Sequence, residues 1–298
     1  MKALKAEGGL FLMTLIWGGT FLFTKIGLEY CSTPMYLIFR FSTALILSLI
    51  FFRKYIFSIG KQTARQGFIL GLFFGGGFLL QTYGLEFTTV TKSAFITGMA
   101  VPLTPFISWL IQKKKISIWS ITGVVIAFVG LLIFAQPDFY NVNIGDALTL
   151  ISTFFWAFYI TYMDVFTKGS TSKAKSGQLV FMQFVGAIPL VLLTSIAINL
   201  IDSNSFKLVY SDELVLSLAY NGILASFFVT LIHTSIQRYT TPVKAALIFS
   251  MEPIIASALA VIFVGAVLQG HEYYGGAILL LGVLTSEVGG FFKNRAAR

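Results

Sequence analysis

The stretch Phe87-Thr88-Thr89-Val90-Thr91-Lys92-Ser93-Ala94 occurs a second time, slightly changed, as Tyr239-Thr240-Thr241-Pro242-Val243-Lys244-Ala245-Ala246. The two stretches are 152 residues apart in a chain of 298 residues. A second match supports the same repeat, because Trp17 and Trp156 lie 139 residues apart in comparable apolar surroundings. The sequence therefore indicates that the chain consists of two related copies.

The chain is strongly apolar throughout both copies. Hydrophobic residues make up 56% of it and charged residues only 11%, whereas soluble domains carry about 25% charged residues. A helix needs roughly 20 mainly apolar residues to cross the hydrocarbon core of a bilayer, and helices satisfy their own backbone amides there. We predict an all-α integral membrane protein with ten transmembrane helices, at Gly9–Ile26, Pro34–Phe52, Gln66–Gly84, Ser93–Ile111, Ile118–Ala135, Ala147–Met163, Gly177–Leu200, Leu214–Ile236, Ala245–Val264 and Tyr274–Phe292.

The repeat divides these helices into two groups of five, which predicts a first copy at residues 1–136 and a second at residues 137–298. Because five is odd, the second copy has to enter the membrane from the opposite side. We therefore expect two inverted five-helix repeats, an arrangement typical of secondary transporters with a substrate site where the halves meet.

The basic residues indicate the orientation, since Lys and Arg in short loops mark the cytoplasmic side. Sixteen of the 21 basic residues fall at the termini or in alternate connections: Lys2, Lys5, Arg53, Lys54, Lys61, Arg65, Lys113, Lys114, Lys115, Lys168, Lys173, Lys175, Arg238, Lys293, Arg295 and Arg298. We expect a multi-pass protein of the cell membrane, a bacterial inner membrane, with both termini cytoplasmic. The net charge of +9 then reflects topology, and no nucleic-acid partner is expected.

Several short motifs resemble those of the drug/metabolite transporter superfamily, specifically its EamA-type ten-helix carriers. They are Trp17-Gly18-Gly19-Thr20-Phe21, Arg40-Phe41, Gly145-Asp146, Trp156-Ala157, Lys244-Ala245-Ala246 and Met251-Glu252-Pro253. The resemblance implies transport of small metabolites, amino acids, vitamins or toxic compounds, often outward and often coupled to protons. The family usually places a Gly-Glu pair at the ends of helices 4 and 9, and this chain has Gln112-Lys113 and Gly265-Ala266 there instead.

Glu252 is the principal candidate for substrate or coupling-ion binding. Charged side chains in the hydrocarbon are costly and tend to be functional. Pro253 follows Glu252, and Pro102 lies at the comparable place in the first copy, so both are predicted helix breaks that point to a carrier's site. Arg40 should lie at a similar depth and needs an acidic or carbonyl partner. A purely structural role remains open for both charged residues.

Further candidates are polar or aromatic groups in the predicted helices. His233 has a side chain suited to proton transfer, although a lone histidine in a membrane span is more often a packing residue. The remaining groups that could line a cavity for a small organic substrate are Trp17, Thr20, Gln81, Tyr83, Trp156, Tyr159, Gln183 and Asn221.

These patterns predict a secondary transporter of small organic metabolites, an exporter working by alternating access, with proton coupling left open. The alternative is an intramembrane enzyme or a lipid scramblase-like protein. We expect no enzyme activity, no cofactor and no metal site, because the chain lacks a Gly-Lys-Ser/Thr phosphate loop and has only two His and one Cys. The expected partners are the substrate and the lipid bilayer, with the chain a monomer or homodimer in which Gly123, Gly130, Gly275 and Gly282 form scaffold or dimer contacts.

Overall fold

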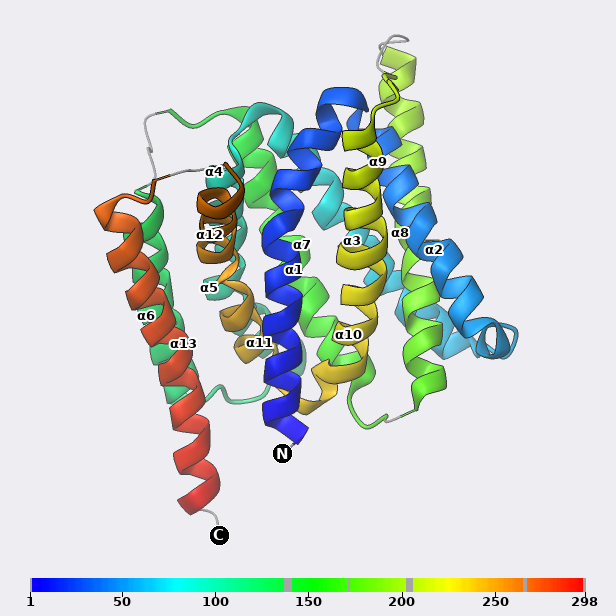
Figure 1. Cartoon of the computed structure of the whole chain (residues 1–298). Helices are drawn as coiled ribbons and strands as arrows, with labels where there is room; N and C mark the ends of the chain where they lie inside the picture. The colour runs from blue at the N-terminus through cyan, green and yellow to red at the C-terminus, as the bar shows by residue number, and fades with distance from the viewer. Residues whose placement is uncertain (1, 137–140, 171, 202–205, 265–266, 297–298) are drawn as a thin grey trace.

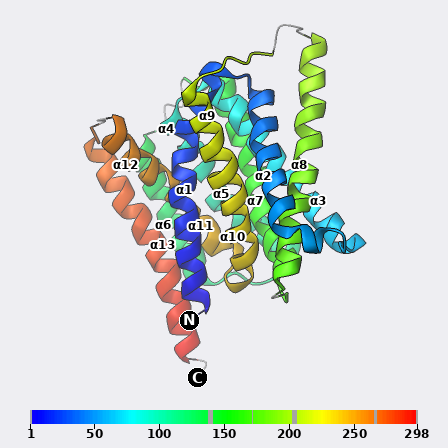
Figure 2. The same ribbon diagram turned by 45° about the vertical axis from the view of Figure 1, so that its right-hand side comes forward.

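The computed structural model of the chain describes residues 2–136, 141–170, 172–201, 206–264 and 267–296. The helices stand side by side in one bundle with both chain ends at the same end of it, as Figures 1 and 2 show from two sides. The first predicted copy contains α1 (Lys2–Tyr30), α2 (Thr33–Ile56), α3 (Lys61–Phe87), α4 (Val90–Gly98), α5 (Ala100–Gln112) and α6 (Ile118–Ala135). The second contains α7 (Ile144–Thr167), α8 (Lys173–Ile201), α9 (Asp212–Ala219), the π-helix η1 (Tyr220–Phe228), α10 (Val229–Ile236), the 3-10 turn η2 (Gln237–Tyr239), α11 (Pro242–Phe249), α12 (Glu252–Val264) and α13 (Gly270–Ala296).

The helices are long and apolar enough for a multi-pass membrane protein. Within the described ranges, nine helical segments have the length and hydropathy to cross a membrane, and they coincide with the first nine predicted spans. The tenth predicted span, Tyr274–Phe292, falls in α13, whose side chains from residue 287 onward lie outside the described part. Apart from an isolated bridge between Cys31 and Leu208, the regular structure of the described residues is helical.

Two of the membrane-crossing segments are interrupted at matching places. α4 ends at Gly98 and α5 begins at Ala100, while α11 ends at Phe249 and α12 begins at Glu252. At both interruptions a backbone N–H bonds three residues back instead of four, from Met99 to the Ile96 carbonyl (2.9 Å) and from Met251 to the Ile248 carbonyl (3.1 Å). The interruptions are therefore related by the 152-residue offset of the repeat.

The predicted breaks at Pro102 and Pro253 need a correction of position. Each helix has already resumed when the proline arrives, since α5 begins at Ala100 and α12 at Glu252. Proline is tolerated in the first turn of a helix, because the N–H it lacks would have no partner inside the helix there. The prolines thus follow the interruptions by one to three residues.

The segment from α9 to α10 also departs from regular α-helix, which the sequence did not predict. Residues Tyr220–Phe228 form a π-helix, a form that is often found at functional sites. The carbonyl of Ala225 in this stretch accepts a hydrogen bond from Nε1 of Trp17 at 3.0 Å. The π-helix is thereby tied to the middle of α1.

α6 and α13 lie side by side through glycines, as Figures 1 and 2 both show. A Cβ atom added at Gly123 would lie 2.6 Å from the Gly282 carbonyl oxygen, and one added at Gly282 would lie 2.6 Å from the Gly123 carbonyl oxygen. Gly130 and Gly275 face each other in the same way. The glycines predicted to make scaffold or dimer contacts therefore make scaffold contacts within the chain, because only glycine allows the two backbones to approach so closely.

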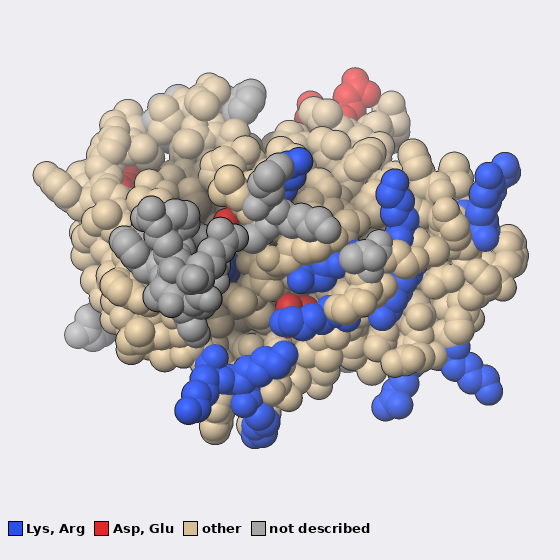
Figure 3. Space-filling view, turned by 90° about the horizontal axis from the view of Figure 1, so that it is seen from below, with Lys and Arg blue, Asp and Glu red and all other residues tan. Residues whose placement is uncertain are grey.

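Basic residues gather at the end of the bundle that carries both termini. Figure 3 views the molecule from that end and shows numerous Lys and Arg side chains with few Asp or Glu. The short connections α2–α3 and α5–α6 lie at this end. Lys61 directly follows the first of them, and Lys113–Lys115 lie in the second. This gathering of Lys and Arg at one end is the pattern from which we predict that both termini are cytoplasmic.

Candidate substrate cavity

A small cavity lies in the interior of the bundle, where the two interrupted segments meet α1, α3 and α7. Its free volume is about 40 Å³, enough for a few water molecules but far below the 300–1,000 Å³ of a typical ligand pocket. It is lined by Trp17, Thr20, Phe21, Phe78, Gln81, Thr97, Gly98, Ala100, Val101, Trp156, Ile160, Ala246, Phe249, Ser250 and Glu252. Any larger substrate requires the helices to move apart.

Glu252 is the single ionisable side chain in that lining. It is the first residue of α12, directly after the interruption, and only 7% of it is exposed. No described residue forms a hydrogen bond or ion pair with its carboxyl group. Because a buried carboxyl group without a partner is costly, this position is suited to receive a proton or a positively charged group.

Two tryptophans from matching positions of the two predicted copies form part of the aromatic wall of the cavity. The ring centres of Trp17 and Trp156 are 5.9 Å apart, and Phe78 and Phe249 complete the wall at 4.7 Å from Trp156 and 5.1 Å from Trp17. Nε1 of Trp156 is buried without a hydrogen-bond partner among the described residues, and so is the hydroxyl of Thr20. Both groups can hydrogen-bond to a guest in the cavity.

Polar groups beside the interruptions add to the lining. Gln81 Nε2 donates to Thr97 Oγ1 at 2.8 Å, and Thr97 lies in the last turn of α4. Ser250 occupies the interruption between α11 and α12. The sequence analysis selected Gln81 but missed Thr97 and Ser250, whose position next to a helix interruption was the available signal.

Arg40 lies outside the lining and does not pair with Glu252. It is fully buried, its Nε donates to Ser226 Oγ at 2.8 Å, and its guanidinium carbon lies 3.9 Å from the centre of the Phe78 ring. Its two terminal nitrogens have no hydrogen-bond partner in the described part of the chain. The prediction of an acidic or carbonyl partner for Arg40 is therefore wrong for the described residues. The Ser226 hydroxyl and the face of the Phe78 ring contact its guanidinium group instead.

The other predicted cavity residues do not belong to the lining. The His233 ring packs against Trp17, Tyr159 and Phe249 and shares a 2.8 Å hydrogen bond with Gln237. The remaining polar groups bond to one another or stand apart from the cavity: Gln183 donates to the Tyr159 hydroxyl at 3.2 Å, Asn221 donates to the Tyr36 hydroxyl at 2.6 Å, and the Tyr83 hydroxyl is buried without a partner among the described residues. The structure thus brings Trp17, Thr20, Gln81, Trp156 and Glu252 together and leaves the rest outside the lining.

Comparison with known proteins gives a consistent result. A model of the EamA-like transporter family matches residues 4–136 and, separately, residues 143–286. A protein of Archaeoglobus fulgidus named "Uncharacterized transporter" is 30% identical over 95% of this chain and 86% of its own length. A Salmonella typhimurium protein named "Probable amino-acid metabolite efflux pump" is 25% identical over 96% of both chains.

A solved crystal structure shares the fold at 13% sequence identity, with a TM-score of 0.73 over 95% of this chain and 98% of the other. The family match covers most of the chain in two parts, and the similar proteins that carry a functional name are transporters. This chain belongs to the EamA-like transporter family of the drug/metabolite transporter superfamily.

Proposed function

We propose that this protein is a secondary transporter that exports small organic metabolites by alternating access, and that Glu252 binds the substrate or a coupling proton. The observation that carries the proposal is the unpaired carboxyl group of Glu252, buried in an aromatic cavity between two interrupted helices. In carriers of known mechanism, interrupted helices at corresponding places of two halves mark the transport site.

Alternating access requires two arrangements of nearly equal free energy, and an inverted repeat supplies them by symmetry. The contacts between α6 and α13 support such a relationship. The 152-residue offset makes Gly275 the counterpart of Gly123 and Gly282 the counterpart of Gly130. In the structure the contacts are crossed, since Gly123 packs against Gly282 and Gly130 packs against Gly275. Reciprocal contacts of this kind arise where a two-fold axis passes between two equivalent elements.

Export is supported by the Salmonella typhimurium protein named "Probable amino-acid metabolite efflux pump", which the chain resembles over nearly its whole length. A proton gradient directed into the cell drives export if an acid in the cavity exchanges a proton for the substrate. Glu252 is the acid placed to do so, because the remaining lining is uncharged. The aromatic walls favour a substrate with a flat or apolar part.

The test is transport by purified protein in proteoliposomes across a panel of amino acids, amines and other small metabolites, with and without a pH gradient. The wild type should accumulate at least one compound in response to the gradient. Glu252→Gln keeps the size and the hydrogen-bonding capacity of the side chain but cannot titrate, so it should fold normally and lose gradient-driven accumulation.

Glu213→Gln is the matched control, because Glu213 is exposed in the first turn of α9 and does not line the cavity. It should transport like the wild type. Unchanged pH-dependent transport by Glu252→Gln would remove this residue from the mechanism. Failure of the wild type to move any compound of the panel would contradict the proposed substrate class.

A further inference from the structure

One ion pair occurs twice in the molecule, once in each copy. Lys92 Nζ lies 2.6 Å from Asp146 Oδ2, and Lys244 Nζ lies 3.1 Å from Glu7 Oε1. The lysines are 152 residues apart, like the stretches that contain them, and the acids are 139 residues apart, like Trp17 and Trp156. We call Lys92–Asp146 the distal pair and Lys244–Glu7 the terminal pair.

Each pair joins the two halves of the chain. The distal pair connects α4 of the first copy to α7 of the second, and the terminal pair connects α11 of the second copy to α1 of the first. Both lysines occupy the first turn of their helix, where Thr89 and Thr241 cap the N-terminus by accepting from the lysine backbone N–H.

The two pairs lie at opposite ends of the cavity. α4 and α11 start at opposite ends of the bundle, with α11 starting near the chain termini (Figure 1). Both helices then run inward and line the cavity, α4 with Thr97 and Gly98 and α11 with Ala246 and Phe249. Lys92 lies five residues before Thr97, and Lys244 lies five residues before Phe249, which is about 7.5 Å along each helix at the usual rise per residue.

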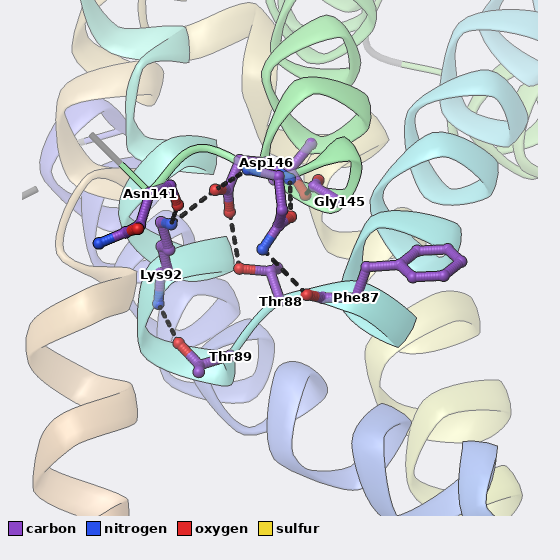
Figure 4. Close-up of polar contacts among 9 residues, drawn as sticks. Phe87, Thr88, Thr89, Lys92, Asn141, Gly145 and Asp146 are labelled. Atoms are coloured by element: carbon purple, nitrogen blue, oxygen red, sulfur yellow. Dashed lines mark hydrogen bonds and ion pairs between the residues drawn. The ribbon is translucent and has the colours of Figure 1, made fainter. Parts of the chain in front are cut away.

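The distal pair belongs to a larger hydrogen-bonded cluster, shown in Figure 4. Asp146 is 4% exposed, and it also accepts from the Thr88 hydroxyl at 2.7 Å and from the Asn143 backbone N–H at 3.0 Å. Lys92 donates in addition to the Asn141 carbonyl at 3.0 Å. These bonds hold the start of α4 against the start of α7.

The terminal pair lacks one of these contacts. Thr240 is the counterpart of Thr88, and its buried hydroxyl has no hydrogen-bond partner among the described residues. Both residues of the terminal pair are 18% exposed on their side chains. Among the described residues, Asp146 of the distal pair therefore accepts a side-chain hydrogen bond that has no equivalent at Glu7 of the terminal pair.

We propose that the two ion pairs are the gates of the transport cycle. Each pair closes one end of the cavity by holding an interrupted segment of one copy against the opposite copy. Opening to one side separates the pair at that end while the other pair stays formed. Both pairs are formed in this structure, which agrees with a cavity too small for a metabolite. This role rests on the proposed alternating access but does not depend on the identity of the substrate.

A cysteine placed in the cavity measures the opening of each gate. Ser250→Cys puts a thiol in the lining, and a membrane-impermeant maleimide is added to right-side-out and to inside-out membrane vesicles. The native Cys31 is fully buried outside the membrane-spanning helices, and burial raises the pKa of its thiol to about 11. The chain without the added cysteine therefore serves as the blank.

Lys92→Gln should speed labelling from the distal side and slow it from the side of the termini. The ratio of the two labelling rates should change roughly tenfold, because the loss of this half-buried ion pair should cost more free energy than the loss of an exposed pair and less than that of a fully buried one. Lys244→Gln should change the ratio in the opposite direction. Lys168→Gln is the matched control, because Lys168 directly follows α7 and its 3.1 Å pair with Asp164, four residues earlier, joins no two helices. It should leave the ratio unchanged.

Two double variants test the gate assignment independently of the single variants. Lys92→Gln with Asp146→Asn leaves no unpaired buried charge, so it keeps the distal test available if the single variant does not fold. Glu7→Lys with Lys244→Glu restores a pair of reversed polarity and should return the ratio toward that of the wild type.

The gate assignment is overturned if the distal and terminal variants shift the ratio in the same direction, or if folded variants leave it unchanged. The labelling needs no substrate, so its outcome is separate from that of the transport assay. Opposite shifts in a protein that transports none of the panel would retain the gates and contradict only the proposed substrates.

Discussion

Arg40 is buried in α2 beneath the ring of Phe78, and no acidic side chain of the described residues pairs with it. Because a buried charge without a counter-ion is costly, Arg40→Met should unfold at the same temperature as the wild type or higher. Arg40→Lys should be less stable by about 1–3 kcal/mol, since an ammonium group cannot reproduce both the flat contact with Phe78 and the bond to Ser226.

Thermal unfolding of the purified variants in detergent measures both effects. A severe loss of stability in Arg40→Met, with Arg40→Lys intact, would mean that the positive charge itself holds the fold together. A stable Arg40→Met that no longer transports would instead assign Arg40 to the transport cycle.

Single residues were predictable where their chemistry conflicts with lipid. Glu252 was selected because a carboxyl group beside Pro253 is unusual in an apolar helix, and it does line the cavity. The face on which a residue lies was not predictable, because these helices are apolar on all sides and give no period to follow. Tyr83 and Tyr159 were therefore selected together with Gln81, although only Gln81 lines the cavity.

At the scale of helices, the packing of α6 against α13 leads to a direct test. A methyl group at Gly282 would lie 2.6 Å from the Gly123 carbonyl oxygen, so Gly282→Ala should lower the free energy of unfolding by about 1–3 kcal/mol. Gly276→Ala on the same helix is the control, because its nearest neighbours would be 3.6 Å away. Denaturation in detergent should separate the two variants, and equal stability would argue against the close backbone contact.

Helix positions followed from the apolar pattern, since nine predicted spans coincide with helices of the described chain. The interruptions inside the helices were predicted less accurately from the sequence. Proline marked the neighbourhood of both interruptions but not the residues at which the hydrogen bonding changes, Met99 and Met251. The π-helix at Tyr220–Phe228 had no sequence signal, because it depends on contacts such as the one between Trp17 and Ala225.

The orientation of the whole molecule is tested by topology reporters. Sixteen of 21 basic residues lie at the termini and in alternate connections, so a reporter fused after Arg298 should be active in the cytoplasm. A reporter inserted after Lys115 should behave in the same way, and one inserted after Lys207 should be active on the opposite side. Activity of the Arg298 fusion outside the cytoplasm would contradict both the ten-helix count and the predicted orientation.

At the level of the whole chain, the sequence predicts the repeat but not the ion pairs that join its two predicted copies. Lys92 and Lys244 were noticed as part of the repeated stretch. Their partners Asp146 and Glu7 belong to the opposite copies and follow the other offset, so only the folded chain brings them together. A repeat shows which residues are equivalent and does not show which residues meet.

The two halves differ at the charged residue of the cavity. The counterpart of Glu252 in the first copy is Ala100, which also lines the cavity. One carboxyl group can hold one proton or one cationic group at a time. Under the proposed exchange, a neutral substrate leaving against one proton moves one net elementary charge per turnover, so the membrane voltage contributes about 2.3 kcal/mol per 100 mV to its export. A singly charged cation leaving against one proton moves no net charge, and its export depends on the pH gradient alone.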